Sequence, residues 1–317
     1  MSIQLPRDLA QPLTISGRVA AKVMLDLTLY LQGPSVQELD FLADWFARMA
    51  PAGRIVKYKI AEHPYWVPLS KPVLTASGRA AAQAGQSLPY LEPARNRVRE
   101  GRAFEVGFWD GRSIDDVDGS WSFNCTRVHL RSRGLFSFVR ILVPLQTDPA
   151  VLMRAACTLA DNVEFISGHG GLVFTYDPRL KIDAMDHIYA GARRFWGIDV
   201  EDLNVTLPLT RQAIKGVGWL TLLGKQFVTP ALAERSQGLS DVVCQQYRQG
   251  FVFIAGTEPT PCDRHRPDSG VDPLFTLARA LAPMYLDAHP DFTGERFIQH
   301  GNTLGWIRRF IEPGGWT

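Results

Sequence analysis

Histidine is the side chain in this sequence with the best chance of performing chemistry near neutral pH. His169 lies in the GHGG run at 168–171. No G-x-S-x-G motif accompanies this run, so it does not predict the oxyanion loop of a lipase-like hydrolase. We interpret the run as a strand bent by glycines, with an incidental histidine. None of the other histidines is paired with a nucleophile in a recognisable motif; they are His63, His129, His187, His265, His289 and His300.

The pair Gly224-Lys225 is the nearest approach to a phosphate-binding loop. Such a loop requires a glycine five positions before Gly224, where this chain has Trp219. It also requires Ser or Thr after the lysine to bind magnesium, and Gln226 stands there. We therefore predict no enzyme and no cofactor. A hydrolase built from dispersed residues stays open if a concave pocket gathers His169, His187 or Asp199 with strongly shifted pKa values.

A metal site is suggested only by the loop that contains Cys262, Asp263 and His265. Cysteine and histidine at this spacing could share one zinc ion, but no second Cys/His pair completes the site. We predict a polar loop and no metal.

The four cysteines show no paired spacing, which fits reduced thiols in a cytoplasm. They are Cys125, Cys157, Cys244 and Cys262.

Acidic side chains gather at two places in the chain. Both clusters can be explained as solvated turns and helix caps. They could also face a cationic surface of a partner, where opposed potentials accelerate association and suppress wrong partners. The first cluster is flanked by Trp109 and Trp121, residue types that often anchor the centre of an interface. The clusters consist of Asp110, Asp115, Asp116 and Asp118, and of Asp199, Glu201 and Asp202.

Alternating and helical patterns predict the elements that would position these residues. From Val19 to Leu31 every odd position is apolar, which indicates a long strand with one buried face. Ser35 and Glu38 predict a capping box at the start of a helix that Pro51 ends. A strand at 54–60 completes this unit. Further strands, helices and hairpins are expected at 103–109, 121–130, 135–145, 150–162, 163–176, 183–194, 241–247, 251–255 and 272–287.

Strand–helix–strand order thus occurs twice, at 19–60 and 135–176. We expect an α+β fold with a mixed, mostly antiparallel sheet covered by helices, and the repeated order raises the hypothesis of two related halves. The N-terminal half would be 1–101, including an irregular Pro-rich connection. The C-terminal half would be 102–317, packed with the first as one compact unit.

Composition is that of an ordinary folded protein. Hydrophobic residues make up 46% and charged residues 21%. The net charge of +2, from 34 basic and 32 acidic residues, predicts neither bulk nucleic-acid affinity nor DNA mimicry. No basic segment leads into an apolar run at the N-terminus, and no apolar stretch reaches the ~18 residues of a membrane helix. We expect a cytoplasmic protein.

The stretch 191–228 carries a family resemblance. Its FWGIDVED and IKGVGWLTLLG runs, together with GHGGLVFTYDP at 168–178, resemble the TsiV-like immunity proteins of type VI secretion, the partners of nuclease effectors. The resemblance covers 135–250 well and the N-terminal third only in general pattern. Gly218 departs from it, since Asn is usual at that position.

The resemblance implies an immunity protein that binds a cognate type VI effector and blocks it sterically, without chemistry of its own. The expected effector is a restriction-endonuclease-like nuclease such as VRR-Nuc, whose DNA channel would be occluded. The two acidic clusters and their tryptophans would then contact this effector. A nucleic-acid-binding module remains the other alternative if Arg127, Arg131 and Arg133 form one continuous basic face.

Overall fold

The computed structural model describes residues 3, 5–51, 55, 57–60, 67–68, 91–111, 120–130, 134–236, 238–266 and 269–316. The strands are β1 (Leu13–Ile15), β2 (Arg18–Leu31), β3 (Lys57–Ile60), β4 (Val67–Pro68), β5 (Phe104–Trp109), β6 (Ser122–His129), β7 (Leu135–Val143), β8 (Ser167–Tyr176), β9 (Ile198–Val200), β10 (Leu220–Gly224), β11 (Val242–Tyr247) and β12 (Gly250–Ala255). The α-helices are α1 (Arg7–Ala10), α2 (Val36–Met49), α4 (Glu92–Arg99), α5 (Ala150–Asn162), α6 (Lys181–Arg194), α7 (Leu203–Thr206), α8 (Pro230–Ser236), α9 (Asp272–Leu281), α10 (Glu295–His300) and α11 (Thr303–Ile307).

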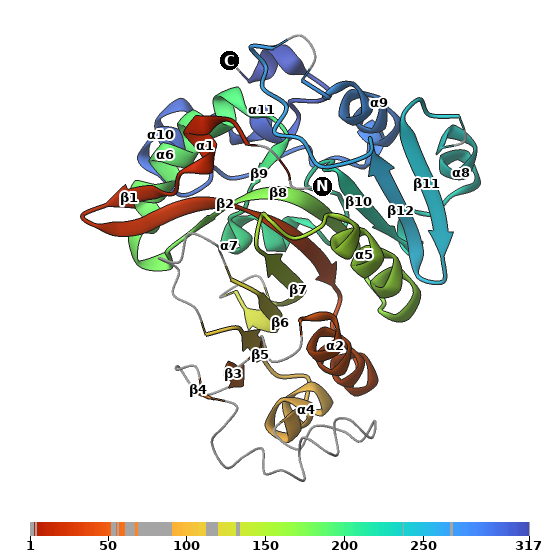
Figure 1. Cartoon of the computed structure of the whole chain (residues 1–317). Helices are drawn as coiled ribbons and strands as arrows, with labels where there is room; N and C mark the ends of the chain where they lie inside the picture. Colours follow the sequence, from red (N-terminus) through yellow and green to blue (C-terminus); the bar gives the residue numbers. More distant parts are fainter. Residues whose placement is uncertain are drawn as a thin grey trace.

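One sheet holds all of the strands that the structure describes (Figure 1). Its order is β11-β12-β10-β8-β2-β7-β6-β5-β3-β4, with β1 paired to β2 and β9 paired to β8. Every pairing is antiparallel except that of β8 with β9, which is parallel. The expected α+β fold with a mostly antiparallel sheet is therefore confirmed.

Strand β2 is the centre of the sheet, because β7 and β8 pair along its two sides. Its odd positions from Ala21 to Leu31 are apolar and join the main core, as predicted. The prediction of a single buried face was wrong, since Lys22, Asp26, Thr28 and Tyr30 are buried as well. Helix α7 and the 3₁₀ turn Leu207–Leu209 contribute Leu203 and Leu207 to a second apolar cluster around Tyr30. A polar side chain that points to this face is therefore removed from water.

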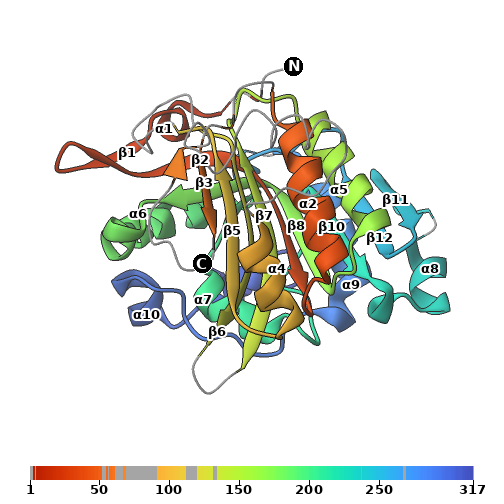
Figure 2. The ribbon, with the colours of Figure 1, turned by 90° about the horizontal axis from the view of Figure 1, so that it is seen from below.

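Helices α2, α4 and α5 lie over one face of the sheet (Figure 2). Helix α2 begins with the predicted capping box, in which Glu38 N donates to Ser35 Oγ at 3.2 Å and Ser35 N donates to Glu38 Oε2 at 2.8 Å. The two strand–helix–strand units, β2-α2-β3 and β7-α5-β8, share the sheet, and β2 lies between β7 and β8. Their relation by duplication, and a division of the chain at residue 101, stay predictions.

The C-terminal segment packs against α6. Helices α6 and α10 contact each other (Figure 1), and Tyr189 of α6 packs edge-on against Phe297 of α10 with 5.0 Å between ring centroids. Trp306 of α11 and Trp316 are fully buried. Within the described residues, no helix is long and apolar enough to cross a membrane.

Candidate functional site

Strands β8 and β9 bring three ionisable side chains together on the face of the sheet that carries Asp26 and Tyr30 of β2. His169 lies on β8 opposite Thr28 of β2. Asp199 and Glu201 are two positions apart in and just after β9, so their side chains point the same way. The glycines of the GHGG run make this approach possible. A Cβ atom on Gly168 would lie 2.7 Å from the carbonyl oxygen of Thr28, too close for any other residue without a shift of the strands.

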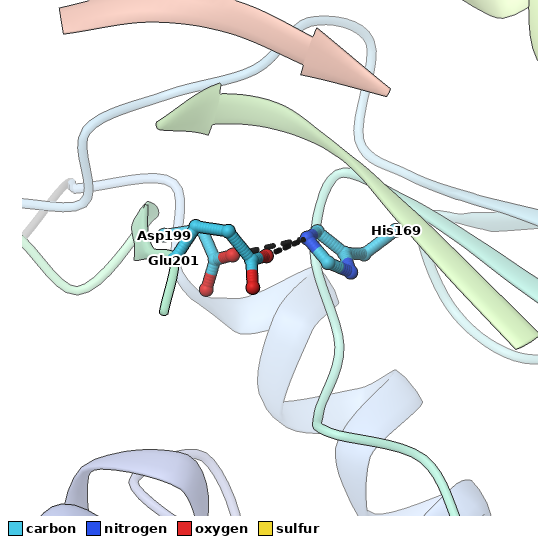
Figure 3. Close-up of side chains that lie close together, drawn as sticks. All are labelled: His169, Asp199 and Glu201. Atoms are coloured by element: carbon cyan, nitrogen blue, oxygen red, sulfur yellow. Dashed lines mark ion pairs between the residues drawn. The ribbon is translucent and has the colours of Figure 1, made fainter. Parts of the chain in front are cut away.

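The imidazole of His169 faces both carboxylates (Figure 3). Its Nε2 atom lies 3.0 Å from Asp199 Oδ2 and 3.0 Å from Glu201 Oε2. Lys215 completes the group from the loop before β10. Its Nζ donates to Asp199 Oδ2 at 2.7 Å, to Glu201 Oε2 at 3.1 Å and to the carbonyl oxygen of Val200 at 2.7 Å. We refer to His169, Asp199, Glu201 and Lys215 as the ion-pair cluster.

A second buried ion pair adjoins the ion-pair cluster. Arg140 Nε of β7 donates to Asp26 Oδ2 of β2 at 2.6 Å, and Thr28 Oγ1 donates to Asp26 Oδ1 at 3.1 Å. Arg309 approaches from the C-terminal segment, where its guanidinium stacks on Trp306 and donates to the carbonyl oxygen of Trp196. Burial lowers the pKa of Arg309 to about 10. Charged groups from six parts of the chain thus meet on this side of the sheet.

All four members of the ion-pair cluster are charged at neutral pH. Burial alone would lower the pKa of His169, but Asp199 and Glu201 raise it to about 9. Burial opposes ionisation of Asp199 and Glu201 too, yet Lys215 and His169 hold the pKa of each carboxyl below its ordinary value. The carboxylates in turn raise the pKa of Lys215 against the effect of burial. Two cations and two anions therefore balance, and no member is poised to exchange a proton near pH 7.

The ion-pair cluster also has the composition of a metal site. One ligand atom each from His169, Asp199 and Glu201 lie within 4.8 Å of one another. Lys215 Nζ already bonds to both carboxylates and so contributes the positive charge that a metal ion would bring. The adjoining cavity of about 30 Å³ has room for a water molecule or two and not for an organic substrate. This geometry is that of an internal brace between segments.

Comparison with known proteins places the chain in a family. The model of the family TsiV, described as type VI immunity for VRR-NUC, matches residues 87–310. The chain belongs to the TsiV family. A solved structure titled Pseudomonas aeruginosa T6SS protein PA0821 shares the fold, with a TM-score of 0.70 and 20% identity over 98% of this chain and 91% of that one. A search among curated proteins finds no match to the sequence.

TsiV is an immunity family and not an enzyme family, which confirms the expectation that the chain is not an enzyme. The structure does gather His169 and Asp199 with shifted pKa values, the condition set above for a hydrolase. His187, however, is exposed on α6 and lines a different hollow. The zinc candidates do not converge either: Cys262 is buried, whereas Asp263 pairs with Arg194. The alternative of a nucleic-acid-binding module depends on a basic face formed by Arg127, Arg131 and Arg133. Arg131 and Arg133 lie outside the described residues.

The second acidic cluster of this TsiV protein lies largely below the surface. Glu201 and Asp202 are each 1% exposed, and Asp199 is partly exposed. Asp202 accepts from Lys181 Nζ at 2.9 Å and from Thr293 Oγ1 at 2.7 Å, and thereby ties α6 to the C-terminal segment. In the sequence, the only feature that suggested a surface site at these three residues was their negative charge. That signal could not reveal that lysines from other segments bind these carboxylates.

Of the first acidic cluster, the structure describes Asp110, which directly follows β5 in the β5–β6 hairpin. Asp110 is buried; its backbone N–H donates to the carbonyl oxygen of Trp121 at 3.0 Å, and its Oδ2 accepts from Trp121 N at 3.1 Å. Trp121 is buried too, whereas Trp109 is partly exposed beneath Lys57 Nζ, 4.7 Å from its ring centroid. These contacts fix the base of the hairpin. Asp115, Asp116 and Asp118 lie outside the described residues.

Sequence reasoning missed Lys215, Arg140 and Asp26. Asp26 and Arg140 carried a usable signal, because each is a charged residue inside a mostly apolar strand. Such residues require a buried partner of opposite charge. Lys215 is followed by the GVGWLTLLG run and carried the same signal. Only the strand pairing, however, shows which partner each one has.

Proposed function

We propose that this TsiV-family protein acts in the cytoplasm, where it binds a VRR-Nuc effector of type VI secretion and blocks that nuclease sterically. The match to the immunity family over residues 87–310 carries the proposal. Steric blockade requires a rigid surface of stable shape, since order that exists before binding lowers the entropic cost of association. The buried ion-pair cluster supports this requirement because it braces β8, β9 and the loop before β10.

The first contact that we propose is the acidic run 115–118, which the sequence predicts to be the tip of the β5–β6 hairpin and which we call the acidic hairpin tip. Asp115, Asp116 and Asp118 concentrate negative charge within four residues of the sequence, which suits the cationic groove of a DNA-cleaving enzyme, whereas Asp110 is buried. Trp109 at its base offers a partly exposed aromatic surface. Glu201 and Asp202 are already bound by lysines, so we assign them, with Asp199, a positioning role beneath the effector-binding surface.

Co-expression tests the proposed function directly. The product of the adjacent gene in the producing strain is expressed with and without this chain, and growth is followed. We expect growth arrest by the effector alone, rescue by co-expression, and co-purification of the two proteins. A catalytically inactive effector should co-purify equally well, because blockade needs no turnover. A toxic neighbour that neither binds this chain nor loses toxicity in its presence would contradict the proposal.

Charge reversal of the hairpin tip tests the proposed contact. Asp115→Lys with Asp116→Lys is expected to weaken effector affinity about tenfold, chiefly through slower association, and more strongly at low salt. Association and dissociation rates measured by surface plasmon resonance check this. Glu234→Lys with Glu258→Lys, two exposed positions elsewhere, is the matched control. Unchanged affinity in the hairpin variant would remove this contact.

A further inference from the structure

Arginines from three segments line one surface hollow of about 360 Å³ beside the C-terminal end of α6. Tyr189 and Ala190 of α6 form the remainder of its lining. The basic residues that define this arginine hollow are Arg193, Arg194, Arg264, His265 and Arg296. In the sequence, these residues are far from the acidic hairpin tip. None of them belongs to the ion-pair cluster or to the β5–β6 hairpin.

The positive charge of the arginine hollow is only partly neutralised. Arg194 binds two carboxylates, Asp263 Oδ2 at 2.8 Å and Asp8 Oδ2 at 3.1 Å. Arg193, Arg264 and Arg296 are exposed, and none has a carboxylate oxygen within 4.0 Å among the residues that the structure describes. The helix dipole favours cations in the last turn of α6, which accounts for Arg193 and Arg194. It does not account for Arg264 and Arg296, which come from other segments.

The backbone around the arginine hollow is fixed by hydrogen bonds. Arg264 N donates to the carbonyl oxygen of Arg194 at 3.0 Å, and Trp196 N donates to that of Cys262 at 3.1 Å. Arg296 N donates to Asp186 Oδ1 at 2.9 Å, which anchors α10 on α6. The Arg264 guanidinium also lies over the Trp196 ring, 5.3 Å from its centroid. The hollow therefore exists before any partner arrives.

We propose that the arginine hollow receives acidic side chains, Asp or Glu, from the surface of the effector. This inference rests on the proposed function and specifies a second contact of it. A guanidinium presents a planar fork that matches a carboxylate, and Arg194, which lines the hollow, binds both carboxylate oxygens of Asp263 in that way. A volume of about 360 Å³ accommodates one or two side chains and not a DNA duplex. The net charge of +2 likewise provides no long-range attraction for nucleic acid.

Charge reversal with matched controls tests this docking site. Arg264→Glu with Arg296→Glu is expected to weaken binding of the catalytically inactive effector about 30-fold, because acidic side chains would then face like charges. Arg154→Glu with Arg279→Glu changes two exposed arginines on α5 and α9 and should alter the affinity less than about threefold. Isothermal titration calorimetry at two salt concentrations gives the affinities, and the wild-type value should weaken more with salt than that of the hollow variant. Equal melting temperatures establish that the variants are folded.

The possible results separate this inference from the proposed function. Absence of effector binding by the wild-type chain would contradict both. Wild-type binding that survives reversal of Arg264 and Arg296 would contradict the docking site alone. A 20-base-pair duplex is the second probe. Duplex binding that depends on the two arginines, with unchanged effector affinity, would also overturn the docking site and assign the hollow to nucleic acid.

Discussion

Replacing Lys215 with Met is expected to lower the free energy of unfolding by about 3–5 kcal/mol, because the substitution leaves buried carboxylates without their main cation. Lys215 Nζ bonds to Asp199, Glu201 and the carbonyl oxygen of Val200, and the lysine side chain is 4% exposed. Met preserves the length of the side chain and removes the charge. His169 alone would then face two carboxylates with one positive charge. Urea-induced unfolding at pH 7 measures the difference.

A lysine outside the ion-pair cluster provides the comparison for this result. Lys181 pairs with Asp202 at 2.9 Å, but its side chain is 19% exposed, so Lys181→Met should cost only about 1 kcal/mol. Adding Glu201→Gln to Lys215→Met removes one of the two buried negative charges and should restore part of the lost stability. A loss below about 1 kcal/mol for Lys215→Met would show that the cluster does not brace the fold.

The position of the ion-pair cluster explains why it would matter for an immunity protein. Asp199 lies on β9 and Glu201 just after it, β9 pairs with β8, and Lys215 lies in the loop that leads into β10. The segment between β9 and β10 contains α7, which contributes to the apolar cover over Tyr30. Charged groups thus fix a long connection against the sheet. A loosened connection would change the surface on that side without altering any exposed residue.

Local patterns predicted much of this fold because the physics behind them is local. Alternation in 19–31 gave β2, and the Ser35–Glu38 capping box gave the start of α2. The hairpin predicted from 241–247 and 251–255 is β11–β12; the sequence suggests a turn at Gln249-Gly250, but the turn residues are Arg248 and Gln249, and Gly250 begins β12 paired with Tyr247. Each of these signals depends on residues a few positions apart. A single sequence is sufficient to read them.

The candidate site depended on contacts that no local pattern contains. From the sequence, the acidic run at 199–202 is explained either as a solvated turn or as a contact with a cationic partner, since charged turns are usually solvated. In the fold Asp199 and Glu201 pair with His169 of β8 and with Lys215 of the loop before β10, and Asp202 pairs with Lys181. The GHGG run was correctly predicted as a strand, but the interpretation of His169 as incidental was wrong. Glycine beside histidine indicated close backbone approach without showing what the imidazole would meet.

His169 should make the stability of this protein fall by about 3 kcal/mol between pH 6.5 and pH 9. The folded protein raises the pKa of His169 from 6.5 to about 9, so the folded state holds this proton more tightly than the unfolded chain does. The stabilisation is fully present below pH 6.5 and is lost as the pH rises through 9. Asp199 and Glu201, whose pKa values are lowered, contribute the opposite slope, which lies below about pH 4.5.

Removal of the imidazole separates His169 from every other titrating group. His169→Gln should be less stable than the wild type at pH 6.5 and nearly as stable at pH 9, so that its stability changes little across this interval. His187→Gln, at an exposed histidine on α6, should retain the wild-type slope. Urea unfolding at half-unit pH steps gives both curves. If His169→Gln kept the wild-type slope, the proton lost between pH 6.5 and pH 9 would belong to another group, and the ion-pair cluster would hold a neutral histidine beside a lysine that carries the charge by itself.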